Sequence, residues 1–215
     1  MQGVFGEVEV KVLVAVPALD FCATDFAMSL AALLSKRAYD KKLSREVKLA
    51  LSCCKGSLIM HARNKLMDEA IACGATHIFF LDSDMVVPPD ALDRLIAHHV
   101  PIVGADYVNR VEPHPLNGMP DSVQGTYDGL EVSKNPKGLH RMLTLPFGCI
   151  LISLKVLASM PRPFFKYIEG EDDAHTLSED THFCNIARRV GHTIWCDVGL
   201  TREVGHVGIK VFRHG

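Results

Sequence analysis

The sequence predicts an α/β fold in which helices flank a mixed, mainly parallel sheet. Over the first half of the 215-residue chain, apolar runs of strand length alternate with longer segments of helical periodicity. The run at residues 77–81 is continuously apolar or aromatic, which is typical of a strand buried on both faces of a parallel sheet. We therefore expect right-handed β-α-β crossovers with helices on both faces of the sheet.

The first half is expected to hold four strands, and each of the first three is followed by an expected helix. Strands are expected at residues 10–16, 47–54, 77–81 and 101–107, the first ending in a polar turn at Pro17. Helices are expected from Thr24 or Asp25, from Ser57 to Gly74, and over residues 89–99.

The second half of the chain is richer in turns. Proline and glycine mark residues 111–125 as a loop, and the acidic, turn-rich residues 169–177 are a candidate mobile lid. Strands are expected at residues 129–132, 139–145, 149–152 and 192–196. Helices are expected at residues 155–160 and 178–191, the second capped by Ser178.

Composition gives no sign of a membrane protein or of a generally basic one. The formal net charge is −2, so there is no global electrostatic case for binding nucleic acid. No apolar run approaches 18 residues and no signal peptide is apparent. Seven cysteines without a C-x-x-C pair favour a reducing compartment. We expect a cytoplasmic protein without a transmembrane segment.

Asp82, Ser83 and Asp84 follow the buried strand at residues 77–81 directly. This is the carboxyl end of the strand, where open α/β sheets bind their ligands. Alternation along the extended backbone directs both carboxylates to the same side, where they can address one Mg²⁺ or Mn²⁺. We expect the pair at the mouth of the main cleft. The alternative is an acidic turn that begins the next helix.

Six short segments together resemble GT-A glycosyltransferases, most closely the inverting family-2-like group of small phage and bacterial type. They are residues 14–18, 61–66, 78–84, 145–150, 178–180 and 205–206, spread over nearly the whole chain in the family's order. The resemblance implies the GT-A (nucleotide-diphospho-sugar transferase) fold as a single domain over residues 1–215. Residues 1–108 would be its nucleotide-binding half, and residues 109–215 its acceptor-side half.

The resemblance also implies a nucleotide-sugar donor, Mn²⁺ or Mg²⁺, and transfer to a hydroxyl acceptor. The donor-binding residues that it implies are Pro17, Ala18, Asp20, Arg63, Asn64, Asp82, Ser83, Asp84, Phe147 and Gly148. The metal ligands that it implies are Asp82, Asp84 and His206.

Asp180 matches the family's catalytic carboxylate, the general base that deprotonates the acceptor hydroxyl. It lies beside Glu179 in the first turn of the expected helix, where the helix dipole favours an ionised carboxylate. The alternative is that both residues only stabilise the helix start. Glu171, Asp172 and Asp173 are interpreted as part of a solvated lid rather than as metal ligands.

Several points stay open at the level of sequence. A UDP-sugar is the expected donor, but the second strand is followed by no acidic residue that would contact the base, so guanosine remains an alternative. The acceptor can be a sugar, a lipid carrier or a hydroxylated nucleobase in DNA, and the oligomeric state is unknown. The competing functions are a sugar-nucleotide nucleotidyltransferase and a non-catalytic nucleotide-sugar-binding module.

Overall fold

The computed structural model describes residues 10–39, 47–110, 116–121, 138–170 and 176–208. The strands are β1 (Val10–Ala18), β2 (Val47–Lys55), β3 (His77–Leu81), β4 (Met85–Val86), β5 (Ile102–Gly104), β6 (Met119–Pro120), β7 (Leu139–Thr144), β8 (Cys149–Ser153), β9 (Ile194–Asp197) and β10 (Gly205–His206). The helices are α1 (Thr24–Tyr39), α3 (Ile59–Ala72), α4 (Ala91–Ala97), the 3₁₀ helix η1 (Leu154–Ser159), α6 (Glu179–Arg189) and α7 (Val198–Thr201). The predicted strand at residues 129–132, and residues 171–175 of the lid predicted at residues 169–177, lie outside the described residues.

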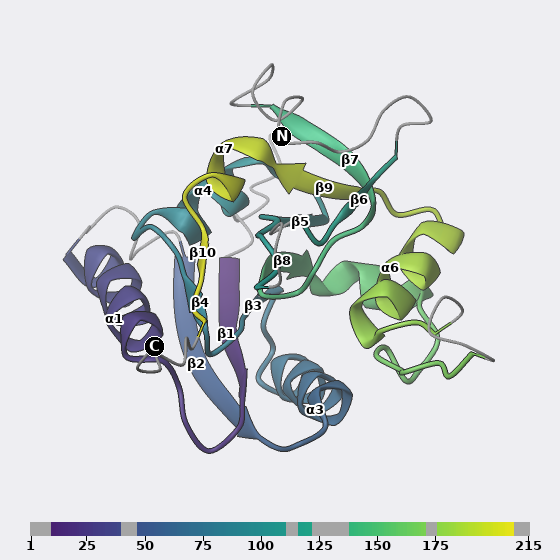
Figure 1. The fold of residues 1–215 in the computed structure, drawn as a ribbon, viewed down its shortest axis with the longest axis horizontal. Helices are drawn as coiled ribbons and strands as arrows, with labels where there is room; N and C mark the ends of the chain where they lie inside the picture. The colour runs from purple at the N-terminus through teal and green to yellow at the C-terminus, as the bar shows by residue number, and fades with distance from the viewer. Residues whose placement is uncertain (1–9, 40–46, 111–115, 122–137, 171–175, 209–215) are drawn as a thin grey trace, which may run out of the picture.

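One mixed sheet forms the centre of the molecule, with the strand order β2-β1-β3-β8-β5-β9-β7-β6 (Figure 1). β1 is parallel to β2 and β3, and β5 is parallel to β9. β8 runs antiparallel between β3 and β5, and β7 is antiparallel to β9. The α/β class with helices around a mixed sheet is therefore as expected. Strands from both predicted halves interleave in this sheet, and the division into halves stays a prediction.

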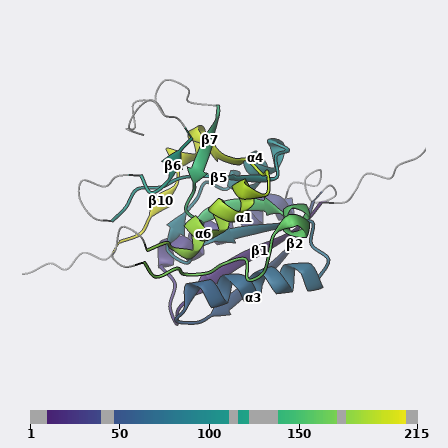
Figure 2. The same cartoon turned by 90° about the vertical axis from the view of Figure 1, so that its right-hand side faces the viewer.

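Helices cover both faces of the sheet, as the β-α-β pattern predicted (Figures 1 and 2). Because side chains alternate along a strand, β1 contributes Val12 and Val14 to the core under α1 and α4, and Leu13 and Ala15 to the core under α3 and α6. The continuously apolar β3 is buried from both sides for this reason.

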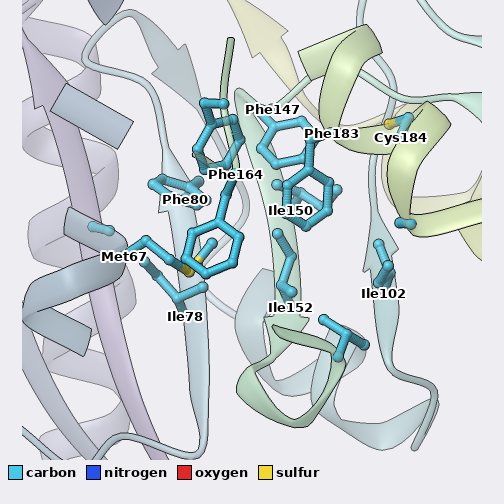
Figure 3. Close-up of a cluster of buried hydrophobic side chains, with 14 of the residues drawn as sticks. Met67, Ile78, Phe80, Ile102, Phe147, Ile150, Ile152, Phe164, Phe183 and Cys184 are labelled. Carbon is cyan, nitrogen blue, oxygen red and sulfur yellow. The ribbon is translucent and has the colours of Figure 1, made fainter. Parts of the chain in front are cut away.

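The core on the α3 and α6 side contains a cluster of aromatic rings (Figure 3). The ring centroids of Phe80 and Phe147 are 6.0 Å apart, and those of Phe147 and Phe183 are 5.1 Å apart. These side chains come from β3, from the residues just before β8, and from α6. Packing the rings together fixes the start of α6 relative to the carboxyl end of β3.

Several predicted boundaries were wrong. β1 continues through Pro17 instead of turning there, because its pairing with β3 ends at Ala15 and the missing N–H of the proline interrupts no ladder on that side. The strand predicted over residues 101–107 is shortened to β5. Ser178 is at the N-cap position of α6, but its hydroxyl makes no capping hydrogen bond.

A two-stranded sheet pairs β4 antiparallel with β10, with His206 opposite Met85 (Figure 1). Two-residue strands are too short to show a periodic pattern, so the sequence did not predict this pairing. It carries the end of the described chain back to the residues that follow β3. Within the described residues, no helix is long and apolar enough to span a bilayer.

Candidate active site

One buried guanidinium connects four parts of the predicted site. Arg63, on α3, is 3% exposed. It donates hydrogen bonds to Asp82 Oδ2 at 3.1 Å, to Glu179 Oε1 at 3.2 Å and to the carbonyl oxygen of Phe147 at 3.2 Å. Residues from α3, from the carboxyl end of β3, from the approach to β8 and from α6 therefore meet at a single side chain.

Burial is the largest single influence on the pKa of each charged group in this cluster. Burial raises the pKa of the Asp82 carboxyl, and the nearby Arg63 charge only partly offsets this. Burial likewise raises the pKa of Glu179 against the opposing effect of Arg63. For Arg63, burial lowers the pKa, but the two carboxylates outweigh it and the net shift is upward. Arg63 is therefore firmly protonated, and one positive charge is shared by two carboxylates.

Asp82 retains unused bonding capacity. Its Oδ2 is bonded to Arg63, whereas its buried Oδ1 has no hydrogen-bond partner among the described residues. An unpaired buried carboxylate oxygen is costly, and such atoms in native proteins usually have a partner such as a water or an ion. The Oδ1 atom therefore has a bonding position that no described residue fills.

Asp84 and His206 form a second polar cluster, brought together by the pairing of β4 with β10. Asp84 Oδ2 lies 3.7 Å from His206 Nε2. The N–H of Val207 donates to the carbonyl oxygen of Asp84 at 2.8 Å, which fixes the two strands side by side. The guanidinium of Arg110 contacts both Asp84 Oδ2 and His206 Nε2.

The three predicted metal ligands thus contact two different arginines: Asp82 contacts Arg63, whereas Asp84 and His206 contact Arg110. Asp84 and His206 are adjacent, but Asp82 is bonded to Arg63. In the described part of the chain, no three histidine, cysteine or acidic side chains converge as a complete ligand set. Two side-chain ligands still suit Mg²⁺ or Mn²⁺, because such ions are commonly held by one or two carboxylates together with substrate phosphates.

Three predicted donor-binding residues lie at the end of β1 or just after it. Because β1 is parallel to β3, this is the edge of the sheet where Asp82 follows β3. Pro17 and Ala18 end β1, and Asp20 follows and forms an exposed ion pair with Lys55 at 2.8 Å. The N–H of Ala23 donates to the carbonyl oxygen of Ser83 at 3.1 Å. This contact places the loop after β1 beside the Asp82-Ser83-Asp84 segment.

Three other predicted donor-binding residues have structural partners. The Asn64 amide exchanges hydrogen bonds with the backbone of Phe165, at 2.8 Å from its Nδ2 and 3.2 Å to its Oδ1. Phe147 is fully buried in the aromatic core. A Cβ at Gly148 would lie 2.7 Å from the Tyr107 hydroxyl. The close approach that requires glycine here is therefore made by Tyr107.

Asp180 lines a cavity of about 300 Å³ together with His206. The other lining residues are Tyr107, Asn117, Thr144, Leu145, Pro146, Ser178 and Thr181. Four of these carry hydroxyls and one an amide, a composition suited to a ligand with several hydroxyl groups. The volume is at the lower end of the range of about 300–1,000 Å³ typical of ligand pockets.

The side chains of Asp180 and Glu179 point in different directions. Asp180 Oδ1 accepts from the Thr181 N–H at 2.7 Å and from the Ser178 hydroxyl, and the side chain faces the cavity. Glu179 is 9% exposed and turns toward Arg63. Of the two predicted catalytic carboxylates, only Asp180 faces the cavity.

A larger cavity of about 640 Å³ lies elsewhere, and neither Asp82 nor Asp84, which were expected at the mouth of the main cleft, lines it. It is bounded by α4 and the α7 region, and its His98, Arg94 and Asp197 side chains are engaged with one another. Asp84 instead lies beside His206, which lines the smaller Asp180 cavity, and Asp82 belongs to the Arg63 cluster.

Three residues around this smaller cavity were missed by sequence reasoning. Arg110 follows the predicted strand at residues 101–107, Tyr107 ends it, and Asn117 lies within the predicted loop. The available signal was a polar and cationic stretch after a strand expected in the sheet. The contacts of Arg110 with Asp84 and His206 depend on which distant segments of the chain meet in space. Such a meeting leaves no local pattern in the sequence.

Comparison with known proteins supports the fold. No family model and no curated protein matches the sequence. Among solved structures 141 chains match, including the crystal structure of A197 from STIV. That structure aligns with a TM-score of 0.58 at 11% sequence identity, over 96% of this chain and 98% of the other. At this identity the likeness establishes a shared fold.

Proposed function

We propose that the protein is a metal-dependent glycosyltransferase of GT-A type that moves a sugar from a nucleotide-sugar donor to a hydroxyl acceptor with inversion. One observation supports this most directly. Residues that the family resemblance selected from distant segments, Arg63, Asp82 and Glu179, meet in one buried cluster. Asp180 and His206, selected in the same way, line one cavity.

The arrangement suits the chemistry of such a transfer. The acceptor oxygen attacks the anomeric carbon as the bond to the diphosphate breaks, and a base must take the acceptor's proton. Asp180 faces the cavity and is held by Ser178 and Thr181, so it suits that base. A bound divalent cation would neutralise charge on the departing diphosphate.

The side chains available for that cation are Asp84 and His206. Asp82, the third predicted ligand, is bonded to Arg63 and keeps one unpaired carboxylate oxygen. Oxygen and imidazole ligands together suit Mn²⁺. The polar cavity supports a hydroxyl-rich acceptor, and the exposed loop after β1 is the proposed nucleotide side, with a UDP-sugar as the first donor to test.

The test is a donor screen with and without a divalent cation. Release of nucleoside diphosphate from a panel of UDP- and GDP-sugars should require Mn²⁺ or Mg²⁺ and stop with chelator. Asp84→Asn should abolish the release, whereas Asp68→Asn, an exposed ion-paired carboxylate of α3, should not.

Each alternative gives a different result. A binding module would bind the donor without releasing diphosphate. A nucleotidyltransferase would instead release pyrophosphate from a nucleoside triphosphate and a sugar phosphate. Metal-independent release, or release unchanged in Asp84→Asn, would contradict the proposed site.

A further inference from the structure

Arg110 places its guanidinium between the two side chains that would bind the cation. Its Nη2 donates to Asp84 Oδ2 and lies 2.6 Å from His206 Nε2. Its Nε donates to the same His206 nitrogen at 3.0 Å. A single positive group therefore bridges the carboxylate and the imidazole.

His206 is held in the tautomer that a metal ligand needs. Its Nδ1 lies 3.0 Å from the carbonyl oxygen of Val108, and since a carbonyl only accepts, Nδ1 carries the proton. Its Nε2 faces Arg110, and since a guanidinium only donates, Nε2 presents a lone pair. A backbone carbonyl that orients the ring in this way is the usual support of a histidine that ligates a metal.

The spacing of the two lone-pair atoms also suits one metal ion. Two ligands at about 2.1 Å from a cation lie about 3.0 Å apart at a right angle and about 3.6 Å apart at 120°. Asp84 Oδ2 and His206 Nε2 are 3.7 Å apart. Arg110 thus occupies the space that a cation shared by these atoms would need.

Arg110 is free to leave this position. Its side chain is 46% exposed, whereas that of His206 is 15% exposed. Its alkyl part passes beside Gly208, since a Cβ there would lie 3.7 Å from Arg110 Cδ. An exposed ion pair contributes little to stability, so swinging the guanidinium into solvent is cheap.

We propose that Arg110 is a tethered cation that holds Asp84 and His206 in place and competes with the divalent cation for them. This rests on the proposed metal site and adds an order of events. A metal ion alone must displace the guanidinium and stay near a positive charge. A metal ion that arrives with a diphosphate gives the displaced Arg110 an anionic partner, so the two ligands bind cooperatively.

The experiment measures Mn²⁺ binding directly, by the loss of the free Mn²⁺ EPR signal, with and without UDP. Without UDP, Arg110→Gln should bind Mn²⁺ about tenfold more tightly than the parent protein, the effect of removing one positive charge about 5 Å from a divalent cation in a water-like dielectric. Addition of UDP should tighten Mn²⁺ binding strongly in the parent and much less in Arg110→Gln.

Matched variants separate this inference from the proposed function. Arg141→Gln removes an exposed arginine paired with Asp121 and should bind Mn²⁺ like the parent. Arg110→Lys keeps the positive charge but loses the planar guanidinium that bonds both side chains at once. Its Mn²⁺ affinity should lie between those of the parent and Arg110→Gln. Asp84→Asn should lose Mn²⁺ binding.

If Arg110→Gln binds Mn²⁺ no more tightly than the parent while Asp84→Asn loses it, the metal site stands and the competition is refuted. If the parent and Arg110→Gln both fail to bind Mn²⁺, with and without UDP, the inference and the proposed metal site are both overturned. Thermal unfolding of each variant identifies any loss of binding that comes from misfolding.

Discussion

The buried guanidinium of Arg63 is bonded to Asp82 and Glu179, whose side chains are 21% and 12% exposed. Removing it strands two buried carboxylates, and breaking a buried ion pair in this way costs about 3–5 kcal/mol. We expect Arg63→Met to lower the free energy of unfolding by that amount in urea denaturation. Combining Arg63→Met with Glu179→Gln should restore part of the lost free energy of unfolding, because this second substitution removes one of the two unpaired carboxylate charges.

The matched control is Arg162→Met, which breaks an exposed pair with Asp68. Surface pairs contribute about 0–1 kcal/mol, so this variant should be nearly as stable as the parent. Equal losses in the Arg63 and Arg162 variants would mean that the buried cluster contributes no more to stability than a surface contact.

Asp180 is the residue on which the proposed chemistry depends most. Asp180→Asn keeps an oxygen for the Ser178 and Thr181 contacts but removes the basic carboxylate. It should lower kcat for transfer by about 10²–10⁴-fold and leave Mn²⁺ and UDP affinity within about twofold of the parent. Glu179→Gln, which faces Arg63 instead of the cavity, should lower kcat much less. Near-parental transfer by Asp180→Asn would require another base.

At the scale of elements, the contact between Gly148 and Tyr107 joins the approach to β8 with the segment after β5. A Cβ at Gly148 would lie 2.7–2.8 Å from ring and hydroxyl atoms of Tyr107. Tyr107 is 8% exposed and packs edge-on against His206, with ring centroids 5.0 Å apart, so it has little room to retreat. We expect Gly148→Ala to cost about 1–3 kcal/mol by overpacking.

Gly56→Ala is the matched control, because a Cβ there meets nothing within 4 Å. Calorimetric melting of both variants, and of Gly148→Ala combined with Tyr107→Leu, checks the cause of the loss. The combined variant should recover part of the stability that Gly148→Ala loses. If Gly148→Ala and Gly56→Ala have the same melting temperature, the Tyr107 side chain moves aside at little cost and the overpacking argument is wrong.

The same elements show what the sequence can predict. The long periodic helices and the apolar strands were predicted to within a few residues because burial on one or both faces leaves a repeating pattern. The acidic segment after β3 and the carboxylates of α6 followed from that pattern and from the resemblance. The antiparallel β8, the β4–β10 pair and the place of Arg110 did not, because each depends on which distant segments meet in space.

At the scale of the whole molecule, stability should depend on pH through Asp106. This residue is fully buried and lies two residues after β5, and its carboxylate accepts from the N–H groups of Tyr107, Asn117 and Gly118 at 2.7–3.2 Å. These bonds hold Tyr107 and Asn117, which both line the Asp180 cavity, close to one another. Burial raises the Asp106 pKa from 3.8 to about 6, against the effect of the three donors.

The sign of the effect follows from proton linkage. Between pH 4 and 6 the folded protein keeps the Asp106 proton that the unfolded chain releases, so raising the pH through this window removes stability. At about 1.36 kcal/mol per pKa unit, the loss approaches about 3 kcal/mol and is complete above pH 6. Asp106→Asn cannot release a proton, so the stability of the parent relative to this variant should fall by about that amount between pH 4 and 7. Urea denaturation of both proteins across that range measures the difference. A constant difference would show that the Asp106 pKa is the same in the folded and unfolded chains, and a rising one would show that the three N–H donors outweigh burial.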